Sequence, residues 1–250
     1  MTMRDVARQT LVKSGALPSR YMWRNPFKIM EFGALSSGMN IRPTDAILDV
    51  GCGSGPQDLL LARHAGRVVG IDVSESEIAR ARNLAAVYAP GRALEYRCTP
   101  LETAGFARAE FDQVVSFSVF EHIANREVVL DAIADVLKPG GMLRMSVDSM
   151  ATLTDARLVA QHRSQGAVLT YFQPAELRAM LDARGFRDIR LWALFRGDYA
   201  RRAFEGAIRR NHRHDRYGKF WPLVRMTVEE AFTPRGETGL FLCVSAVKAE

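Results

Sequence analysis

The stretch Ile47-Leu48-Asp49-Val50-Gly51-Cys52-Gly53-Ser54-Gly55 decides the fold. It begins as a short apolar run, typical of a buried strand, and continues into three glycines at alternate positions. Glycine is needed where the chain turns sharply and where the backbone must lie against a ligand with no Cβ between them. A helix is expected to start near Pro56, with its free N–H groups facing the same ligand. The stretch therefore predicts a strand, a ligand-binding loop and a helix.

Short apolar runs alternate with amphipathic segments on both sides of this loop. Helical periodicity is present in 57–64, 75–88, 127–137 and 175–183. This alternation predicts an α/β fold, with a parallel sheet covered by helices on both faces. The predicted strands are Ala46–Val50, Val68–Ile71, Leu94–Tyr96, Gln113–Phe117, Gly141–Val147, Ile189–Leu194 and Leu240–Val247.

The second predicted strand ends in Asp72, a carboxylate placed to accept hydrogen bonds from a ribose diol. A dinucleotide site would use the spacing G-x-G-x-x-G, which brings a pyrophosphate to the start of a helix. Here the spacing is G-x-G-x-G, and Asp49 lies two residues before the first glycine. A carboxylate there would repel a pyrophosphate but would suit an ammonium group. These features favour S-adenosylmethionine as the cofactor over a nicotinamide dinucleotide.

Four segments of the chain resemble the class I S-adenosylmethionine-dependent methyltransferases, in particular the small-molecule branch that includes ubiquinone-biosynthesis-type enzymes. They are DVGCGSG at 49–55, VVGIDVS at 68–74, FDQVVSFSVFEHI at 111–123 and LKPGGMLRMSV at 137–147. The resemblance implies a Rossmann-like, doubly wound, seven-stranded sheet whose last strand is antiparallel. It also implies N-terminal helices and a helical insertion before the last strand.

The same resemblance implies a set of cofactor-binding residues. Asp72 would bind the ribose and Val73 the adenine, while Thr99 stands where the family usually has an acid near the adenine amino group. The remaining expected contacts are Asp49, Gly51, Cys52, Gly53 and Gly55 on the methionine side, with Leu101, Ser116 and Phe117 around the adenosine and the sulfonium.

One methyltransferase domain is expected to span 1–250. Its parts are an N-terminal helical cap (1–40), a cofactor-binding core (41–147) and an acceptor-side half (148–250) with a basic insertion at 196–225.

Two residues are candidates for the chemistry of methyl transfer to oxygen. A hydroxyl acceptor benefits from a general base with a pKa near neutrality, which makes His122 the first candidate. Asp148, directly after the fifth predicted strand, is the second. His162 lies in a polar helical stretch and is expected to be solvated. Candidate acceptor contacts are Tyr21, Trp23, Tyr171, Phe172, Arg209 and Arg213.

Several classes of methyltransferase are disfavoured by missing motifs. Metal-dependent O-methyltransferases of this fold carry an acid after strand four and an Asp-Asn pair after strand five. Ser116-Phe117-Ser118 and Asp148-Ser149 stand at those places, so no metal is expected. The Pro-Pro-Tyr-type motif and the Pro-Cys pair of nucleic-acid methyltransferases are also absent from their places.

The net charge of +6 comes from one segment of the 250 residues. Residues 196–225 hold nine basic and three acidic side chains, which accounts for the whole excess. Such a segment could be a solvated helix face, a grip on an anionic acceptor through Arg209 and Arg213, or a surface for RNA or an anionic membrane.

The three cysteines are sparse and unpaired, and the sequence shows neither a secretory signal nor an apolar window that could span a membrane. We therefore expect a soluble cytoplasmic methyltransferase for a small-molecule or glycan-type acceptor. An RNA methyltransferase and a non-catalytic cofactor-binding protein are the alternatives.

Overall fold

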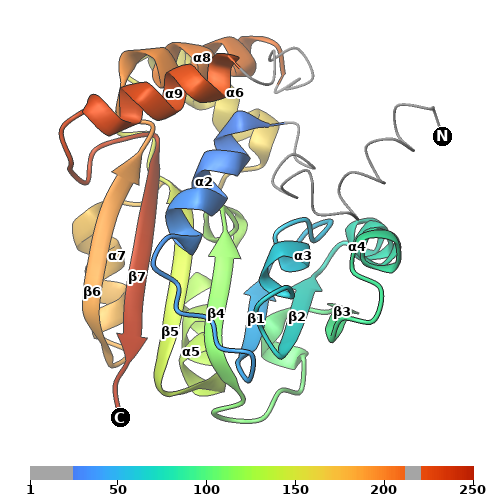
Figure 1. The fold of residues 1–250 in the computed structure, drawn as a ribbon. Coiled ribbons are helices and arrows are strands. Elements are labelled where there is room, and N and C mark those ends of the chain that lie inside the picture. Colours follow the sequence, from blue (N-terminus) through green and yellow to red (C-terminus); the bar gives the residue numbers. More distant parts are fainter. Residues whose placement is uncertain (1–24, 212–220) are drawn as a thin grey trace.

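The computed structural model describes residues 25–211 and 221–250. One seven-stranded sheet in the order β3-β2-β1-β4-β5-β7-β6 runs through the molecule (Figure 1). Strands β1 to β5 pair in parallel, and β7 runs antiparallel to both β5 and β6. The predicted sheet with its antiparallel last strand is confirmed. The strands are β1 Ala46–Val50, β2 Arg67–Asp72, β3 Leu94–Cys98, β4 Phe111–Phe117, β5 Leu137–Asp148, β6 Phe186–Leu194 and β7 Phe241–Lys248.

Helices cover both faces of the sheet, as its alternating side chains require. In β1, Leu48 and Val50 join the large core formed with α5 and α7, whereas Ile47 packs on the opposite face with Phe32 and Leu61. The helices described are α2 Pro26–Ser36, α3 Asp58–Leu61, α4 Glu75–Tyr88, α5 Arg126–Val136, α6 Ala156–Gly166, α7 Pro174–Asp182, α8 Asp198–Arg209 and α9 Trp221–Phe232, with short 3-10 turns at η2 Leu101–Thr103 and η3 Phe120–His122.

Local signals set most of the helix boundaries. Asn25 caps α2 by accepting a hydrogen bond from Phe27 N, and Ser74 caps α4. Helix α3 is shorter than the predicted 57–64, because Arg63 N and His64 N bond to carbonyls three residues back, as in turns, before the chain turns at Gly66 into β2. A Cβ at Gly66 would lie 2.5 Å from the Pro43 carbonyl oxygen, so the turn is too tight for another residue.

A helical cap lies over the carboxyl end of the parallel strands, at the top of Figure 1. It is built from α2, α6, α8 and α9 around a second apolar core. Four aromatic rings form its centre, with Phe27 against Phe195 at 4.7 Å between centroids and Phe204 against Phe241 at 6.0 Å. Helices α8 and α9 occupy the stretch before β7, which confirms the predicted helical insertion.

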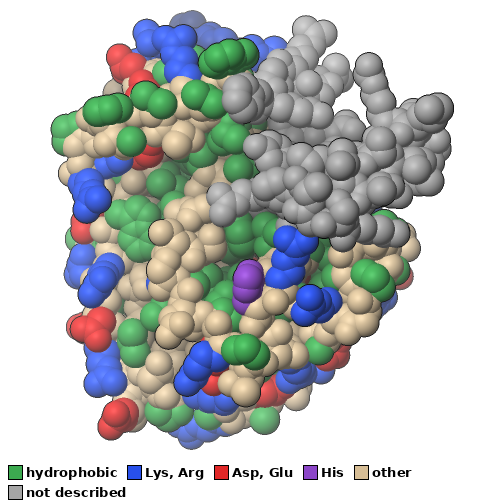
Figure 2. All heavy atoms as spheres, in the orientation of Figure 1, with side chains coloured by type: hydrophobic (Ala, Val, Ile, Leu, Met, Phe, Trp, Pro, Cys, Tyr) green, Lys and Arg blue, Asp and Glu red, His purple; other side chains and the backbone are tan. Residues whose placement is uncertain are grey.

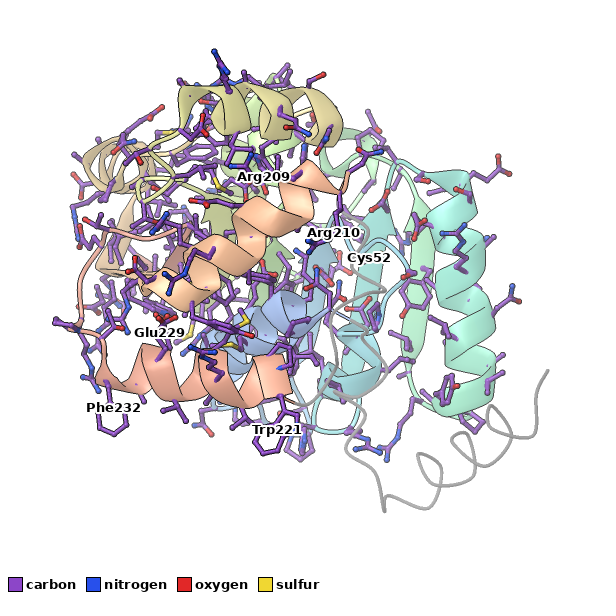
Figure 3. All side chains as sticks on the ribbon, turned by 90° about the horizontal axis from the view of Figure 1, so that it is seen from above. Cys52, Arg209, Arg210, Trp221, Glu229 and Phe232 are labelled. Atoms are coloured by element: carbon purple, nitrogen blue, oxygen red, sulfur yellow. The ribbon has the colours of Figure 1, made fainter. Side chains whose placement is uncertain are left out.

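Glu229 of α9 joins the two helices of the insertion. Its carboxylate accepts hydrogen bonds from Tyr199 N at 2.7 Å and Ala200 N at 3.0 Å, so it caps α8 in place of the missing side chain of Gly197. A Cβ at Gly197 would collide with this carboxylate. In Figure 3, Glu229 points toward α8, whereas Trp221 and Phe232 lie on the outer side of α9.

No helix within 25–211 or 221–250 has the length and apolar character that a membrane crossing requires.

Replacing Asp155 with alanine is expected to lower the free energy of unfolding by about 1 kcal/mol, the usual cost of losing an N-cap. The Asp155 carboxylate accepts hydrogen bonds from Arg157 N at 2.9 Å and Leu158 N at 3.4 Å at the start of α6. Urea denaturation measures the loss, and Asp155→Asn, which can still cap, is the control. Equal midpoints for the alanine variant and the wild type would contradict the assignment.

Candidate active site

The glycine loop after β1 needs glycine at each of its three positions. Gly51, Gly53 and Gly55 have φ of 76°, 54° and 68°, in the left-handed region that other residues avoid. A Cβ at Gly51 would collide with Val119, and one at Gly55 with the Tyr96 ring. At Gly53 the corresponding space is open. The loop therefore keeps its backbone accessible on one side, as a cradle for a ligand does.

A cavity of about 500 Å³ lies at the carboxyl ends of β1, β2 and β4, next to this loop. Asp72 lines it, and its carboxylate accepts hydrogen bonds from Gly53 N at 2.9 Å and Ser74 N at 2.8 Å. The lining includes six residues that the sequence analysis names for the cofactor, namely Gly51, Asp72, Val73, Thr99, Leu101 and Phe117.

Other predicted cofactor residues have structural partners instead. The Cys52 side chain packs with Ile78 and Tyr96, and the Ser116 hydroxyl donates to Val50 O at 2.9 Å. Both are buried and neither lines the cavity, and the packing of the Cys52 side chain agrees with its inert character. A contact of either residue with the cofactor stays a prediction. Gly53 and Gly55 are not among the lining residues. In Figure 3, Cys52 of the glycine loop lies to one side of the cap helices.

Asp49 lies beneath the loop. Its carboxylate accepts a hydrogen bond from Gln57 Nε2 at 2.7 Å and is fully buried, so it does not line the cavity. Burial is the main cause that raises the pKa of Asp49 to about 6. Burial, together with the neighbouring Asp49, raises the pKa of Asp58 well above its usual range. Because two buried carboxyls in contact resist double ionisation, this pair retains a proton near neutral pH.

A second cavity of about 350 Å³ adjoins the first, and Ser118 and His122 line both. Its walls come from α2, α6, α8 and the ends of β5 and β7. The described lining residues are Asn25, Phe27, Lys28, Ser118, Glu121, His122, Asp148, His162, Gln165, Gly166, Val168, Phe204 and Phe241.

Asp148 is the central carboxyl of this second cavity, at the end of β5. His162 Nε2 lies 3.6 Å from Asp148 Oδ2, and His162 Nδ1 lies 2.9 Å from the Tyr171 hydroxyl. Burial raises the pKa of Asp148 to about 7, and the nearby Lys28 ammonium limits that rise. The group therefore changes protonation near neutral pH, as a general base should.

Lys28 and Glu121 also line this cavity, and Glu31 lies next to Lys28. Lys28 Nζ lies 2.9 Å from Glu31, which also accepts hydrogen bonds from the Ser118 and Ser146 hydroxyls. Burial opposes the charge of Lys28, but Glu31, Glu121 and Asp148 outweigh it and raise the pKa of this lysine. Burial and then the charge of Asp148 raise the pKa of Glu121 well above its usual range.

His122 lies where the two cavities meet, with half of its side chain exposed and Nδ1 3.4 Å from Ala167 O. Burial lowers its pKa, so the ring is neutral at physiological pH.

The prediction that His162 is solvated is wrong. The residue is only 5% exposed. Its spacing of four residues from the buried Leu158 is a signal that could have placed it on the inner face of α6. No comparable signal marks Lys28, Glu31 or Glu121.

The predicted acceptor contacts are only partly brought to the second cavity. The Tyr171 hydroxyl lies 2.9 Å from His162 Nδ1, whereas Phe172 is fully buried in the main core and lines neither cavity. Arg209 is exposed on α8, 3.9 Å from Asp155, and does not line either cavity (Figure 3). Tyr21, Trp23 and Arg213 lie outside the described residues.

Part of the basic insertion serves the fold. Arg196 pairs with Glu230 at 2.6 Å, Arg201 pairs with Asp198 and Glu205, and the Arg225 guanidinium lies over the Tyr199 ring. On the face shown in Figure 2, Lys and Arg side chains gather along the top edge, and elsewhere they are scattered among acidic ones. The paired arginines stabilise the cap, so the net charge of the insertion is not by itself a sign of an RNA surface.

Replacing Arg209 with alanine is expected to leave the acceptor KM within about twofold of the wild-type value, as is usual for exposed side chains away from a site. Steady-state kinetics measures this KM with the acceptor that the methyl-transfer screen described below identifies. A tenfold rise in KM would return Arg209 to the acceptor site.

Comparison with known proteins agrees with this geometry. A methyltransferase domain family matches residues 48–145. The ubiquinone biosynthesis O-methyltransferase of Idiomarina loihiensis is 29% identical over 204 residues, which cover 74% of this chain and 82% of that protein. Its counterpart in Nitrobacter winogradskyi is 40% identical over 100 residues, 40% of this chain and 37% of the relative.

Solved structures show the same fold. The YcgJ protein of Bacillus subtilis superposes with a TM-score of 0.64 at 16% identity, over 88% of this chain and 99% of that one. A geranyl diphosphate methyltransferase gives 0.63 at 11% identity, over 88% of this chain and 78% of that one.

The fold and the first cavity define an enzyme that binds S-adenosylmethionine. The chain belongs to the class I S-adenosylmethionine-dependent methyltransferases, with its methyltransferase domain at residues 48–145.

Proposed function

We propose that this methyltransferase acts on a hydroxyl group of a compact small molecule bound in the second cavity. One observation carries the proposal: a buried carboxyl with a pKa of about 7, Asp148, lines a cavity that adjoins the cofactor cavity. The relatives are named as O-methyltransferases, which also supports oxygen as the acceptor atom. A cavity of about 350 Å³ suits a single-ring molecule better than a glycan chain.

The first cavity fits the cofactor. Asp72 presents carboxylate lone pairs for a ribose diol, Val73 and Leu101 provide apolar walls for adenine, and the open space at Gly53 lets the backbone approach the methionine part. When bound, S-adenosylmethionine supplies an electrophilic methyl group and leaves as S-adenosylhomocysteine.

Asp148 is the proposed general base. Its ionised carboxylate accepts the hydroxyl proton of the acceptor as the new carbon–oxygen bond forms, which makes the oxygen a better nucleophile. His162, held by Tyr171, orients Asp148 from the side away from the sheet. The apolar walls of Phe27, Phe204 and Phe241 exclude water and fix the ring of the acceptor, so alignment supplies much of the acceleration.

His122 has a different proposed role. Because it lines both cavities and is neutral, it can position the acceptor oxygen at their junction without adding a charge next to the sulfonium.

The test is a methyl-transfer screen of hydroxylated metabolites with methyl-labelled S-adenosylmethionine, run with and without a metal chelator. We expect the label in an O-methyl ether and the same rate in the presence of chelator, since no described cluster of three or more His, Cys, Asp or Glu could hold a metal. Label recovered only in RNA, or activity that disappears with chelator, would contradict the proposal.

A further inference from the structure

The second cavity has more buried carboxyl groups on and next to its walls than it has cationic side chains to pair with them. Glu121 and Asp148, 1% and 5% exposed, line this cavity, and the fully buried Glu31 lies next to it. Glu31 pairs with Lys28 at 2.9 Å and accepts hydrogen bonds from the Ser118 and Ser146 hydroxyls. Lys28 also acts on Glu121 and Asp148, so three carboxyls share the one ammonium of the described lining.

Glu121 and Asp148 have few partners. The neutral ring of His122 lies 3.9 Å from Glu121 Oε1, and Glu121 Oε2 is buried without a hydrogen-bond partner. Asp148 lies 3.6 Å from His162 Nε2 and interacts with the Glu121 side chain, so the two carboxyls lie close together. An unpaired carboxyl oxygen in a buried place costs free energy, so a native structure retains it mainly where a ligand completes it.

The charge of the residues that line the cavity also disfavours an anionic acceptor. Its described lining contains no arginine, and its single lysine is already paired. A carboxylate or phosphate group would face two acidic side chains in a site that screens charge poorly. The expectation of an anionic acceptor, which rests on the basic insertion, is therefore not supported by the cavity.

We propose that the acceptor carries a cationic ammonium group close to the hydroxyl that is methylated, and that Glu121 binds this ammonium while Asp148 binds the hydroxyl. The proposal rests on the acceptor site proposed above. Glu121 Oε2 is the unpartnered acceptor, and the aromatic walls can stabilise the same cation through their ring faces. An ammonium also favours the ionised form of both carboxyls, which prepares Asp148 to accept a proton.

Three near-isosteric phenols test the proposal by calorimetry on the protein saturated with S-adenosylhomocysteine. They are 2-(aminomethyl)phenol, 2-(hydroxymethyl)phenol and 2-hydroxybenzoate, which place a cation, a neutral hydroxyl and an anion beside the same phenol. We expect the amine to bind at least about tenfold more tightly than the alcohol, because a hydrogen bond between charged groups is stronger than one between neutral groups. The benzoate should bind most weakly of the three. Binding of all three within about twofold, tightest binding by the benzoate, or no binding of the amine at millimolar concentration overturns the proposal.

The variant Glu121→Gln keeps the shape of the side chain and removes its charge. It is expected to lose the preference for the amine while its affinity for S-adenosylhomocysteine stays unchanged. Glu127→Gln, at an exposed acid on α5, is the matched control and should keep the preference. If Glu121→Gln does not fold, as judged by its melting curve, the comparison of the three phenols on the wild-type protein decides the proposal by itself.

Two outcomes separate this proposal from neighbouring ones. If Glu121→Gln weakens the binding of S-adenosylmethionine but keeps the preference for the amine, Glu121 serves the sulfonium and the proposal is wrong. A preference for the amine without methyl transfer to any hydroxyl compound would instead count against oxygen as the acceptor atom, because the binding experiment does not depend on catalysis.

Discussion

Replacing Asp72 with alanine should weaken the binding of S-adenosylhomocysteine by about a hundredfold, because hydrogen bonds to a charged carboxylate contribute about 1.5–3 kcal/mol each. Asp72 ends β2 and lines the first cavity, where its carboxylate also holds Gly53 N and Ser74 N. The substitution would remove the proposed ribose contact and the two hydrogen bonds that hold the loop. Calorimetric titration measures the loss.

The controls for Asp72 separate charge from position. Asp72→Asn retains one carbonyl oxygen and should retain part of the affinity, while Asp135→Ala, at an exposed acid on α5, should bind as the wild type does. The melting curve of Asp72→Ala should stay cooperative. Unchanged affinity in a folded Asp72→Ala protein would remove Asp72 from the cofactor site.

Replacing Asp148 with asparagine should lower kcat by a factor of about 10²–10⁴, the usual contribution of a general base. The substitution keeps the shape of the side chain but cannot take a proton. Because the base acts in its ionised form, the wild-type rate should rise with pH through the pKa of Asp148, about 7. In Asp148→Asn this rise should disappear, and the affinity for S-adenosylhomocysteine should remain unchanged.

The stability of the Asp148 variant provides an independent readout. Burial raises the folded-state pKa of Asp148 to about 7, above the unfolded value, so the folded protein loses stability as pH rises from the unfolded pKa to the folded one. The neutral asparagine is free of this loss and should melt at an equal or higher temperature above pH 7. A wild-type kcat in Asp148→Asn, or the same pH profile, would assign the base to another residue, with His122 the next candidate.

The two cavities differ in how far local sequence could predict them. The first is formed by residues at the ends of neighbouring parallel strands, so Gly51, Asp72 and Thr99 meet wherever such a sheet forms. The second is formed by α2, η3, β5, α6 and α8, which are brought together only by the packing of the cap. Lys28 and His162 are 134 positions apart, and no local pattern connects them.

Local sequence does not show which of two neighbouring side chains faces a cavity. Residues 113–117 form a strand buried on both faces, so an apolar run cannot show which side chains point toward the ligand. Ser116 therefore faces the neighbouring strand β1 while Phe117 lines the cavity. Phe172 and Tyr171 are adjacent, yet one enters the main core and the other reaches His162.

The sequence by itself determined the strands, the glycine loop and the acid after β2, because hydrophobic periodicity and glycine geometry act over a few residues. Only the tertiary structure decided which side chains surround the second cavity and what charge they present. A chain with a net charge of +6 places carboxyls in this cavity and pairs several of its arginines within the cap. Burial and pairing, rather than composition, set the local charge, because both depend on contacts between distant segments.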